Sequence, residues 1–281
     1  MRPSPRRPGS IPGGLHYNPA FVTPAERAEI LTWLGQLHPI WEQRYSANNP
    51  PPAGKEQRWL LRPVYWLGNW QFACLNYYHP PKGIKNRCVA AEQFPPVLAR
   101  LVAKVEAIAR GMYRGADMPE KWHLNTCLVN YYGSRQENEK RIDTARVGEH
   151  KDFEPGPVAS ISLGERAFFQ FISSRRPGTR DEVVFQQWLG DCSLQIFGGE
   201  RWKNRYFHRV QRVERKAGEK FELHTENFET RRINFTFRYV PDEHIVPFCK
   251  LPPGPRDDVR GYIIQLARHS DFFASALSAQ G

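Results

Sequence analysis

The sequence predicts an α+β protein that is mainly β, because two amphipathic helical segments precede seven short apolar runs. These runs are rich in β-branched and aromatic residues and are separated by glycine or charged turns, which is typical of strands. Seven strands without alternating helices favour one antiparallel sandwich or barrel, with the upstream helices packed on one sheet. The runs cover residues 123–132, 158–164, 166–172, 183–188, 191–198, 206–213 and 232–240.

The first helix is expected over residues 23–37, where Thr23, Pro24 and Glu26 form a capping box with proline at the first helical position. A second helix is expected after Pro96, where apolar residues again recur at helical spacing. Each helix has one apolar face and therefore needs a sheet or another helix to cover it.

The chain is long enough for one large domain, which we expect over residues 15–240, with its main sheet region at 123–240. Residues 1–14 contain four prolines in the first twelve positions, and we expect a disordered arm. Residues 241–281 turn to proline, glycine and charge, and we expect an extension that forms a short helix or stays mobile.

Composition narrows the class of protein. No run approaches the roughly eighteen apolar residues of a membrane helix, and the leader lacks the apolar middle of a secretory signal. The five cysteines form no CxxC pair, so neither a disulfide framework nor a structural zinc site is indicated. We expect a cytoplasmic monomer with no membrane contact. The formal charge of +11 fits a polyanionic partner, although many proteins are basic without one.

Three residues form a candidate metal site. His150 and Asp152 are two apart, so on an extended backbone both side chains leave the same face, and His208 can join them from a neighbouring strand. Two histidines and one carboxylate leave three open positions on an octahedral metal, enough for a bidentate keto acid and dioxygen. A zinc hydrolase could use the same three ligands.

A polar strand face about eighty residues later favours a metal site that takes a keto acid and dioxygen over the site of a zinc hydrolase. Arg232, Asn234, Thr236 and Arg238 alternate with apolar residues, so one face of this strand carries two guanidiniums, an amide and a hydroxyl. A solvated edge strand would show the same alternation. Two guanidiniums on one face also match a dicarboxylate, because each binds a carboxylate through two parallel hydrogen bonds.

Six separated motifs resemble the AlkB-like family of Fe(II)- and 2-oxoglutarate-dependent dioxygenases in order and spacing. The resemblance implies a double-stranded β-helix, or jelly roll, and an enzyme that uses Fe(II), 2-oxoglutarate and O2. It also implies that His150, Asp152 and His208 bind the iron. The motifs are CLVNYYG (127–133), EHKDFE (149–154), ASISLGERAFFQF (159–171), LGDCSLQIFGGE (189–200), YFHRV (206–210) and RRINFTFR (231–238).

The same resemblance implies roles for the co-substrate residues. Asn130 and Tyr132 match residues that hydrogen-bond 2-oxoglutarate. Arg238, also expected to be needed for catalysis, matches the arginine that pairs with its distal carboxylate. Arg232 and Asn234 match residues that bracket its iron-side carboxylate.

The resemblance also implies a nucleic-acid substrate, namely oxidative demethylation of N-alkylated nucleobases in DNA or RNA. A lid is expected over residues 57–80, in which Trp70, with Trp66 as the alternative, would stack on the extruded base. Glu154 would contact the base's exocyclic amine. The tryptophans could instead pack the hairpin onto the core, and Glu154 could be an exposed turn residue. A hydroxylase acting on a protein or a small molecule is the alternative function.

Overall fold

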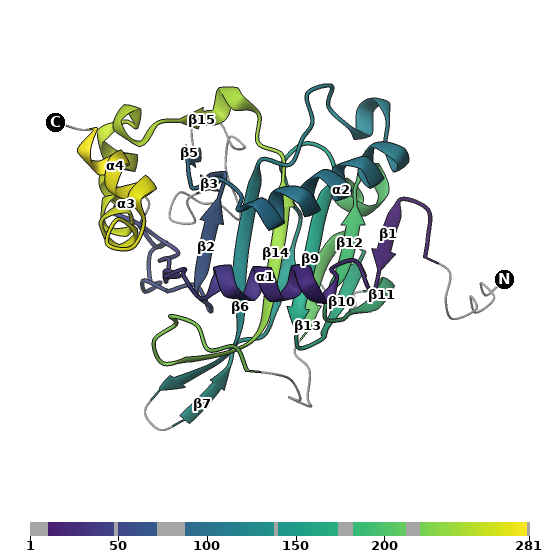
Figure 1. Ribbon diagram of the computed structural model, residues 1–281, viewed down its shortest axis with the longest axis horizontal. Helices are drawn as coiled ribbons and strands as arrows, with labels where there is room; N and C mark the ends of the chain where they lie inside the picture. Colours follow the sequence, from purple (N-terminus) through teal and green to yellow (C-terminus); the bar gives the residue numbers. More distant parts are fainter. Residues whose placement is uncertain are drawn as a thin grey trace.

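Two antiparallel sheets form the centre of the computed structural model, which describes residues 11–47, 50–71, 88–137, 140–173, 182–211 and 220–279 (Figure 1). The major sheet has the strand order β1-β12-β9-β14-β6-β2, and β7 pairs with β6. The minor sheet has the order β11-β10-β13-β8. A third, three-stranded sheet has the order β15-β5-β3.

The strands of the major sheet are β1 (Leu15–Asn18), β2 (Val64–Leu67), β6 (Thr126–Glu137), β7 (Lys140–Asp143), β9 (Val158–Gly164), β12 (Ser193–Phe197) and β14 (Phe228–Arg238). Those of the minor sheet are β8 (Val147–His150), β10 (Ala167–Ile172), β11 (Val183–Leu189) and β13 (Phe207–Gln211). The third sheet contains β3 (Asn69–Gln71), β5 (Cys88–Ala90) and β15 (Ile245–Val246). All seven runs expected from the sequence are strands, and the jelly-roll expectation is confirmed.

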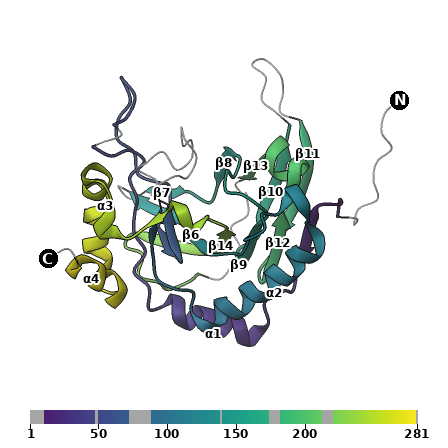
Figure 2. The same cartoon turned by 90° about the horizontal axis from the view of Figure 1, so that it is seen from above.

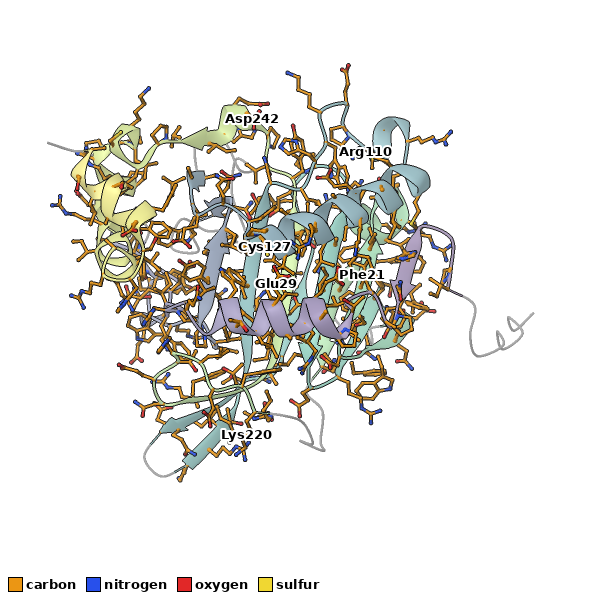
Figure 3. All side chains as sticks on the ribbon, in the orientation of Figure 1. Phe21, Glu29, Arg110, Cys127, Lys220 and Asp242 are labelled. Carbon is orange, nitrogen blue, oxygen red and sulfur yellow. The ribbon has the colours of Figure 1, made fainter. Side chains whose placement is uncertain are left out.

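Two helices cover the outer face of the major sheet, as the sequence predicts. They are α1 (Pro24–Leu34) and α2 (Pro96–Met112), and they lie on the side away from β8 and β13 (Figure 2). The capping box is formed, since the Thr23 hydroxyl accepts from the Glu26 backbone N–H at 3.2 Å and a Glu26 carboxylate oxygen accepts from the Thr23 N–H at 2.9 Å. Figure 3 shows Cys127 of β6 close to these helices, where it is fully buried, whereas Glu29 of α1 is exposed.

The C-terminal extension is part of the fold in its described residues. Its helices α3 (Pro253–Leu266) and α4 (Asp271–Ser278) lie beside the β2 edge of the major sheet (Figure 1). Val259 and Phe273 are buried in the main hydrophobic core, and the Tyr262 hydroxyl accepts from the Gln43 N–H at 2.8 Å.

None of the helices in the described ranges has the length and apolar character needed to cross a bilayer. Short helical turns lie at η2 (Gly115–Asp117), η3 (Glu200–Arg205, a π-helical turn), η4 (Asp242–His244) and η5 (Phe248–Lys250).

Residues 13 and 14, which we expected to belong to a disordered arm, contact the folded domain, whereas residues 1–10 lie outside the described residues. The Gly13 carbonyl accepts from the Trp202 indole N–H at 2.8 Å, and the Gly14 carbonyl accepts from the Tyr113 hydroxyl at 2.8 Å. These contacts position the chain just before it enters β1.

Strand β14 passes very close to both of its neighbours near Arg231. A β-carbon at Gly133 of β6 would lie 1.8 Å from the Glu229 carbonyl oxygen, so only glycine fits there. Gly164 of β9 has φ +82°, and a β-carbon there would lie 2.4 Å from the Arg231 carbonyl oxygen. The pairing of β14 with β6 shifts between Thr230 and Arg232, which leaves Arg231 as the extra residue of a β-bulge.

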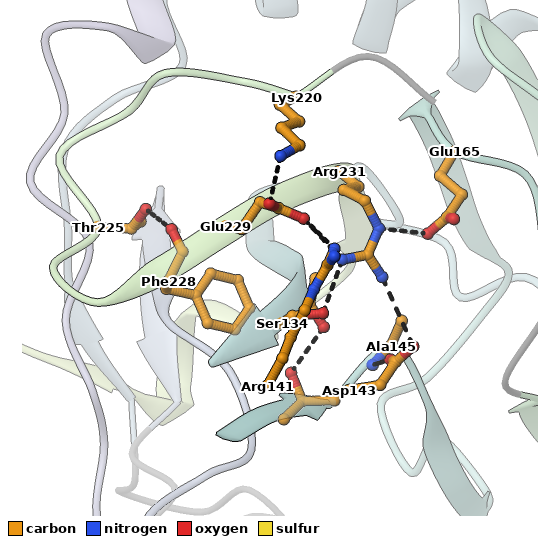
Figure 4. A network of polar contacts seen from close by, with 12 residues as sticks. Ser134, Arg141, Asp143, Ala145, Glu165, Lys220, Thr225, Phe228, Glu229 and Arg231 are labelled. Carbon is orange, nitrogen blue, oxygen red and sulfur yellow. Dashed lines mark hydrogen bonds and ion pairs between the residues drawn. The ribbon is translucent and has the colours of Figure 1, made fainter. Parts of the chain in front are cut away.

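The bulge directs the Arg231 guanidinium into a buried polar network (Figure 4). Its Nη1 donates to the Ser134 hydroxyl at 2.8 Å, its Nε donates to a Glu165 carboxylate oxygen at 3.3 Å, and its Nη2 lies 3.6 Å from an Asp143 carboxylate oxygen. Glu229, which also pairs with Arg231, is exposed enough to bind Lys220 as well. The network therefore joins the β6–β7 hairpin to β14 and to Glu165, which directly follows β9.

We predict that Arg231→Met destabilises the protein by roughly 3–5 kcal/mol, because it removes the positive charge that faces two buried carboxylates. Equilibrium unfolding in urea measures the change. Arg100→Met is the matched control: the Arg100–Glu29 pair is exposed, and its loss should cost no more than about 1 kcal/mol. If the two substitutions lowered the free energy of unfolding equally, the buried Arg231 network would contribute no more to stability than an exposed ion pair.

Candidate active site

A cavity with about 700 Å³ of empty space, its open mouth included, lies between the two sheets. Side chains from both sheets line it, and they divide into three groups. The possible metal ligands are His150, Asp152 and His208; the polar residues are Arg62, Asn130, Tyr132, Lys151, Ser160, Arg232, Asn234, Thr236 and Arg238; the apolar residues are Leu128, Val147, Phe153, Phe169, Leu189, Phe197 and Val210. The fold thus brings eight of the site residues predicted from the sequence, Arg232 among them, into contact with one cavity.

The three predicted metal ligands meet in space. His150 is the last residue of β8, and His208 of β13 is its direct partner across the minor sheet. Asp152 follows two residues after His150, so its carboxylate returns to the same side. One ligand atom from each residue lies within 4.8 Å of the other two, and the His208 Nε2 is 3.4 Å from an Asp152 oxygen.

The electrostatics of these three residues favour binding of a cation. Burial lowers the pKa of His150, and burial together with His150 lowers the pKa of His208 to about 3, so both rings are neutral at pH 7 and keep a lone pair for a metal. Burial would raise the pKa of Asp152, but the positive charges around it, of which that of Arg238 is the largest, together outweigh burial and hold that pKa well below its usual range. The set is therefore two neutral imidazoles and one carboxylate anion.

Two further observations show that these residues fit a divalent metal. The His150 Nδ1 lies 2.8 Å from the Gly148 carbonyl oxygen, a contact that orients the ring and leaves Nε2 for a metal. The Asp152 Oδ2 is buried and makes no hydrogen bond within the described residues. A buried anionic oxygen without a donor is unfavourable, so a cation at this position would satisfy it.

Arg238 lies at the metal end of the cavity, and this corrects an expectation from the sequence. Its Nε and Nη2 donate to the same Asp152 oxygen at 2.9 and 2.8 Å. Arg232 is six residues earlier on β14, which places its backbone roughly 20 Å away along the strand. The two arginines were expected in the opposite order, because alternation along a strand identifies a shared face but not which end of it meets the metal.

Arg232 reaches the other end of the cavity. Its guanidinium is buried, and within the described residues only its Nη2 makes a hydrogen bond, to the Ser162 hydroxyl at 2.9 Å. Its Cζ lies 5.0 Å from the centroid of the Tyr132 ring. Burial lowers the pKa of this arginine. A buried guanidinium with unused donors is suited to bind a carboxylate through two parallel hydrogen bonds.

Arg62 is a cavity residue that we did not predict from the sequence. It comes just before β2, and it lies over the Tyr132 ring at 4.9 Å from the centroid. Its Nε donates to the Asn130 side-chain oxygen, Oδ1, at 2.7 Å. No local pattern marks it, because its contacts are with residues about seventy positions later in the chain.

The predicted amides also face the cavity. Asn234 of β14 donates from Nδ2 to the Ser160 hydroxyl at 2.7 Å and accepts from the Thr236 hydroxyl at 2.8 Å. Asn130 lies directly opposite it on β6. These two amides occupy the stretch of sheet between Arg238 and Arg232, where a ligand that spans both ends would pass.

Trp66 and Trp70 are core residues, and the expectation that one of them stacks on a substrate is wrong for this structure. They are only 3% and 1% exposed, and neither lines the cavity. Their indole nitrogens both donate to one buried Glu42 oxygen, at 2.7 and 2.6 Å. Trp70 also packs against Phe273 of α4, so these aromatic rings join the sheet edge to the C-terminal helices. The expected lid continues over residues 72–80, which lie outside the described residues.

Glu154 is likewise placed away from the cavity, which corrects its expected contact with a substrate. It is 1% exposed, and its Oε1 accepts from the Gln71 amide at 2.9 Å and lies 3.5 Å from the Arg238 Nε. Burial raises the pKa of this carboxyl group. Lys203, from the π-helical turn η3, donates to the Glu154 backbone carbonyl. Glu154 thus lies beside Arg238, and Lys203 is bound to the Glu154 backbone.

Comparison with known proteins points to one family. A model of the 2OG-Fe(II) oxygenase superfamily matches residues 14–238. Among solved structures, OsALKBH1 is similar at 19% identity, with 82% of this chain and 100% of that chain covered and a TM-score of 0.48. YcfD, a ribosomal oxygenase from Escherichia coli solved with cobalt and succinic acid, is similar at 10% identity, with 94% and 66% covered and a TM-score of 0.32. No curated protein matches the sequence.

The match spans most of the chain, including the whole jelly roll and every possible metal ligand identified above. Its cofactors are those expected from the sequence, namely Fe(II) with 2-oxoglutarate and O2 as co-substrates. The chain belongs to the 2OG-Fe(II) oxygenase superfamily, and the protein is an Fe(II)- and 2-oxoglutarate-dependent dioxygenase.

Proposed function

We propose that this dioxygenase is AlkB-like and removes N-methyl groups from nucleobases of DNA or RNA by oxidation. The observation that carries the proposal is the set of six motifs between residues 127 and 238, which resemble the AlkB family in order and spacing. Their polar residues come from strands of both sheets yet line a single cavity.

The chemistry follows from the cofactor and from what this chain's residues do around it. Fe(II), together with 2-oxoglutarate and O2, supplies the oxidant for a C–H bond, and a hydroxylated N-methyl group then leaves as formaldehyde. His150, Asp152 and His208 hold the iron. Arg238 keeps Asp152 ionised and fixed, so that the ligand set stays in place whether or not a substrate is present.

The co-substrate extends from the metal ligands toward Arg232. Its distal carboxylate pairs with Arg232 at the far end of the cavity. The Nε and Nη1 of this guanidinium make no hydrogen bond within the described residues and can donate to the carboxylate. Asn130 and Asn234 face its middle, and Tyr132 lies beside its distal end. This arrangement reverses the roles that the sequence alone indicated for the two arginines.

Two properties of the chain support a nucleobase as the prime substrate. The net charge of +11 favours association with a polyanion. Partly exposed Val147, Phe153 and Val210 line the cavity and can contact the flat face of a base that has been turned out of its stack.

We predict that the protein, with Fe(II) and 2-oxoglutarate, releases formaldehyde from oligonucleotides that contain 1-methyladenine or 3-methylcytosine. Mass spectrometry of the oligonucleotide should show the loss of one methyl group. Unmethylated oligonucleotides of the same sequence are the control. Succinate formation that these methylated substrates do not stimulate, with no formaldehyde, would reject the nucleobase and leave the enzyme class intact.

The metal site gives a second prediction. Asp152→Asn keeps the side-chain shape but removes the anionic ligand, so Mn(II) binding should weaken by more than the roughly 10- to 100-fold that loss of an outer partner costs. Calorimetric titration with Mn(II) measures this, and Asp242→Asn, on the surface, is the control. Unchanged Mn(II) affinity in the Asp152 variant would mean that the metal binds elsewhere.

The two arginines should respond differently to substitution. Arg232→Met should weaken 2-oxoglutarate binding by about thirtyfold or more, since one partner of a buried charge pair is lost, and leave Mn(II) affinity unchanged. Arg238→Met should weaken Mn(II) binding by roughly 10- to 100-fold, because Asp152 loses its orienting partner. Titration of each variant with Mn(II) and then with 2-oxoglutarate separates the effects. The opposite pattern would restore the roles first expected from the sequence.

A further inference from the structure

Arg62 occupies a position that the proposed function does not explain. It lies in the short segment that leads into β2, at the edge of the major sheet, yet its side chain turns inward and is only 6% exposed. It lines the same cavity as Arg232. Two buried guanidiniums in one cavity make that cavity favourable for an anion.

The contacts of Arg62 hold its guanidinium over the Tyr132 ring. The Nε–H donates to the Asn130 side-chain oxygen at 2.7 Å, which anchors one edge of the guanidinium to β6. The Cζ then lies 4.9 Å from the centroid of the Tyr132 ring, within the range of a cation–π contact. Since Asn130 uses its oxygen for Arg62, its amide N–H groups remain the part that can donate elsewhere.

Tyr132 is therefore in contact with two arginines. Arg232 lies 5.0 Å from the centroid of the same ring. The charge of Arg62 also adds to burial in lowering the pKa of Arg232. The two guanidiniums thus repel one another, and a ligand with a carboxylate at this end would offset that repulsion.

We propose that Arg62 is a positioning residue for the distal carboxylate of 2-oxoglutarate: it fixes the Tyr132 ring and, with Arg232, makes the far end of the cavity selective for a diacid. This inference rests on the co-substrate placement proposed above. It assigns to the segment before β2 a role in co-substrate choice, in addition to its place at the sheet edge.

The test compares two ligands that differ only at the distal end. Mn(II)-loaded protein is titrated calorimetrically with 2-oxoglutarate and with 2-oxopentanoate, the same five-carbon keto acid without the second carboxylate. Arg62→Met should weaken 2-oxoglutarate binding by about tenfold and change 2-oxopentanoate binding by less than about twofold. Arg62→Lys keeps the charge but not the guanidinium, so its affinity for 2-oxoglutarate should lie between that of Arg62→Met and that of the unchanged protein.

Arg44→Met is the matched control, because Arg44 also lies over a tyrosine ring, Tyr45, but is exposed and outside the cavity. Arg62→Gln provides the same comparison if the methionine variant does not fold. Unchanged 2-oxoglutarate affinity, or equal weakening of both ligands, would overturn the inference.

Arg232→Met, titrated in parallel, separates this inference from the placement on which it rests. If Arg232→Met weakens 2-oxoglutarate binding and Arg62→Met does not, only the role of Arg62 is rejected. If neither variant has an effect, the placement of the co-substrate is rejected as well. No methylated substrate enters the experiment, so its outcome does not depend on the nucleobase proposal.

Discussion

Burying the Asp152 carboxylate between two neutral histidines is unfavourable unless positive charge lies beside it, and the rest of the cavity is arranged around that requirement. Arg238 donates twice to one of its oxygens, and the other oxygen is left for a cation. Arg238 also lies 3.5 Å from a Glu154 carboxylate oxygen, and Lys203 donates to the Glu154 backbone carbonyl. Because Arg238 is the last residue of β14, the strand that carries Arg232 also carries the side chain that holds the metal ligand Asp152. Strand β14 thus links the metal ligands to the pocket proposed for the diacid.

Most of the fold could be predicted from the sequence because its strong signals are local. Period-two alternation and the capping box depend on neighbouring residues, and all seven strand runs and both upstream helices are present. The strands that were missed, such as β1 and β5, have only four and three residues, too few to show a period. Helices α3 and α4 were left open because their apolar faces are weak, and their burial depends on contacts with Gln43 and Trp70, far away in the sequence.

The site could be predicted in its residue types more than in its geometry. The His-x-Asp pair and the alternating arginine strand identified the residues that line the cavity. Alternation could not tell which arginine is near the metal, because that depends on where β8 and β14 meet. Trp66 and Trp70 lie in an aromatic segment. Its sequence pattern does not distinguish tryptophans that cover a cavity from tryptophans that pack in the core and bind Glu42. Arg62 carries no signal, since its partners are on another strand.

The central claim is that the three ligands and Arg232 bind the two ends of one metal–diacid unit. A crystal structure of the protein grown without oxygen, with Mn(II) and 2-oxoglutarate, tests this most directly. The account predicts Mn(II) bound by His150, Asp152 and His208, and the distal carboxylate paired with Arg232. A metal bound outside these three residues, or a distal carboxylate paired with Arg238, would contradict it.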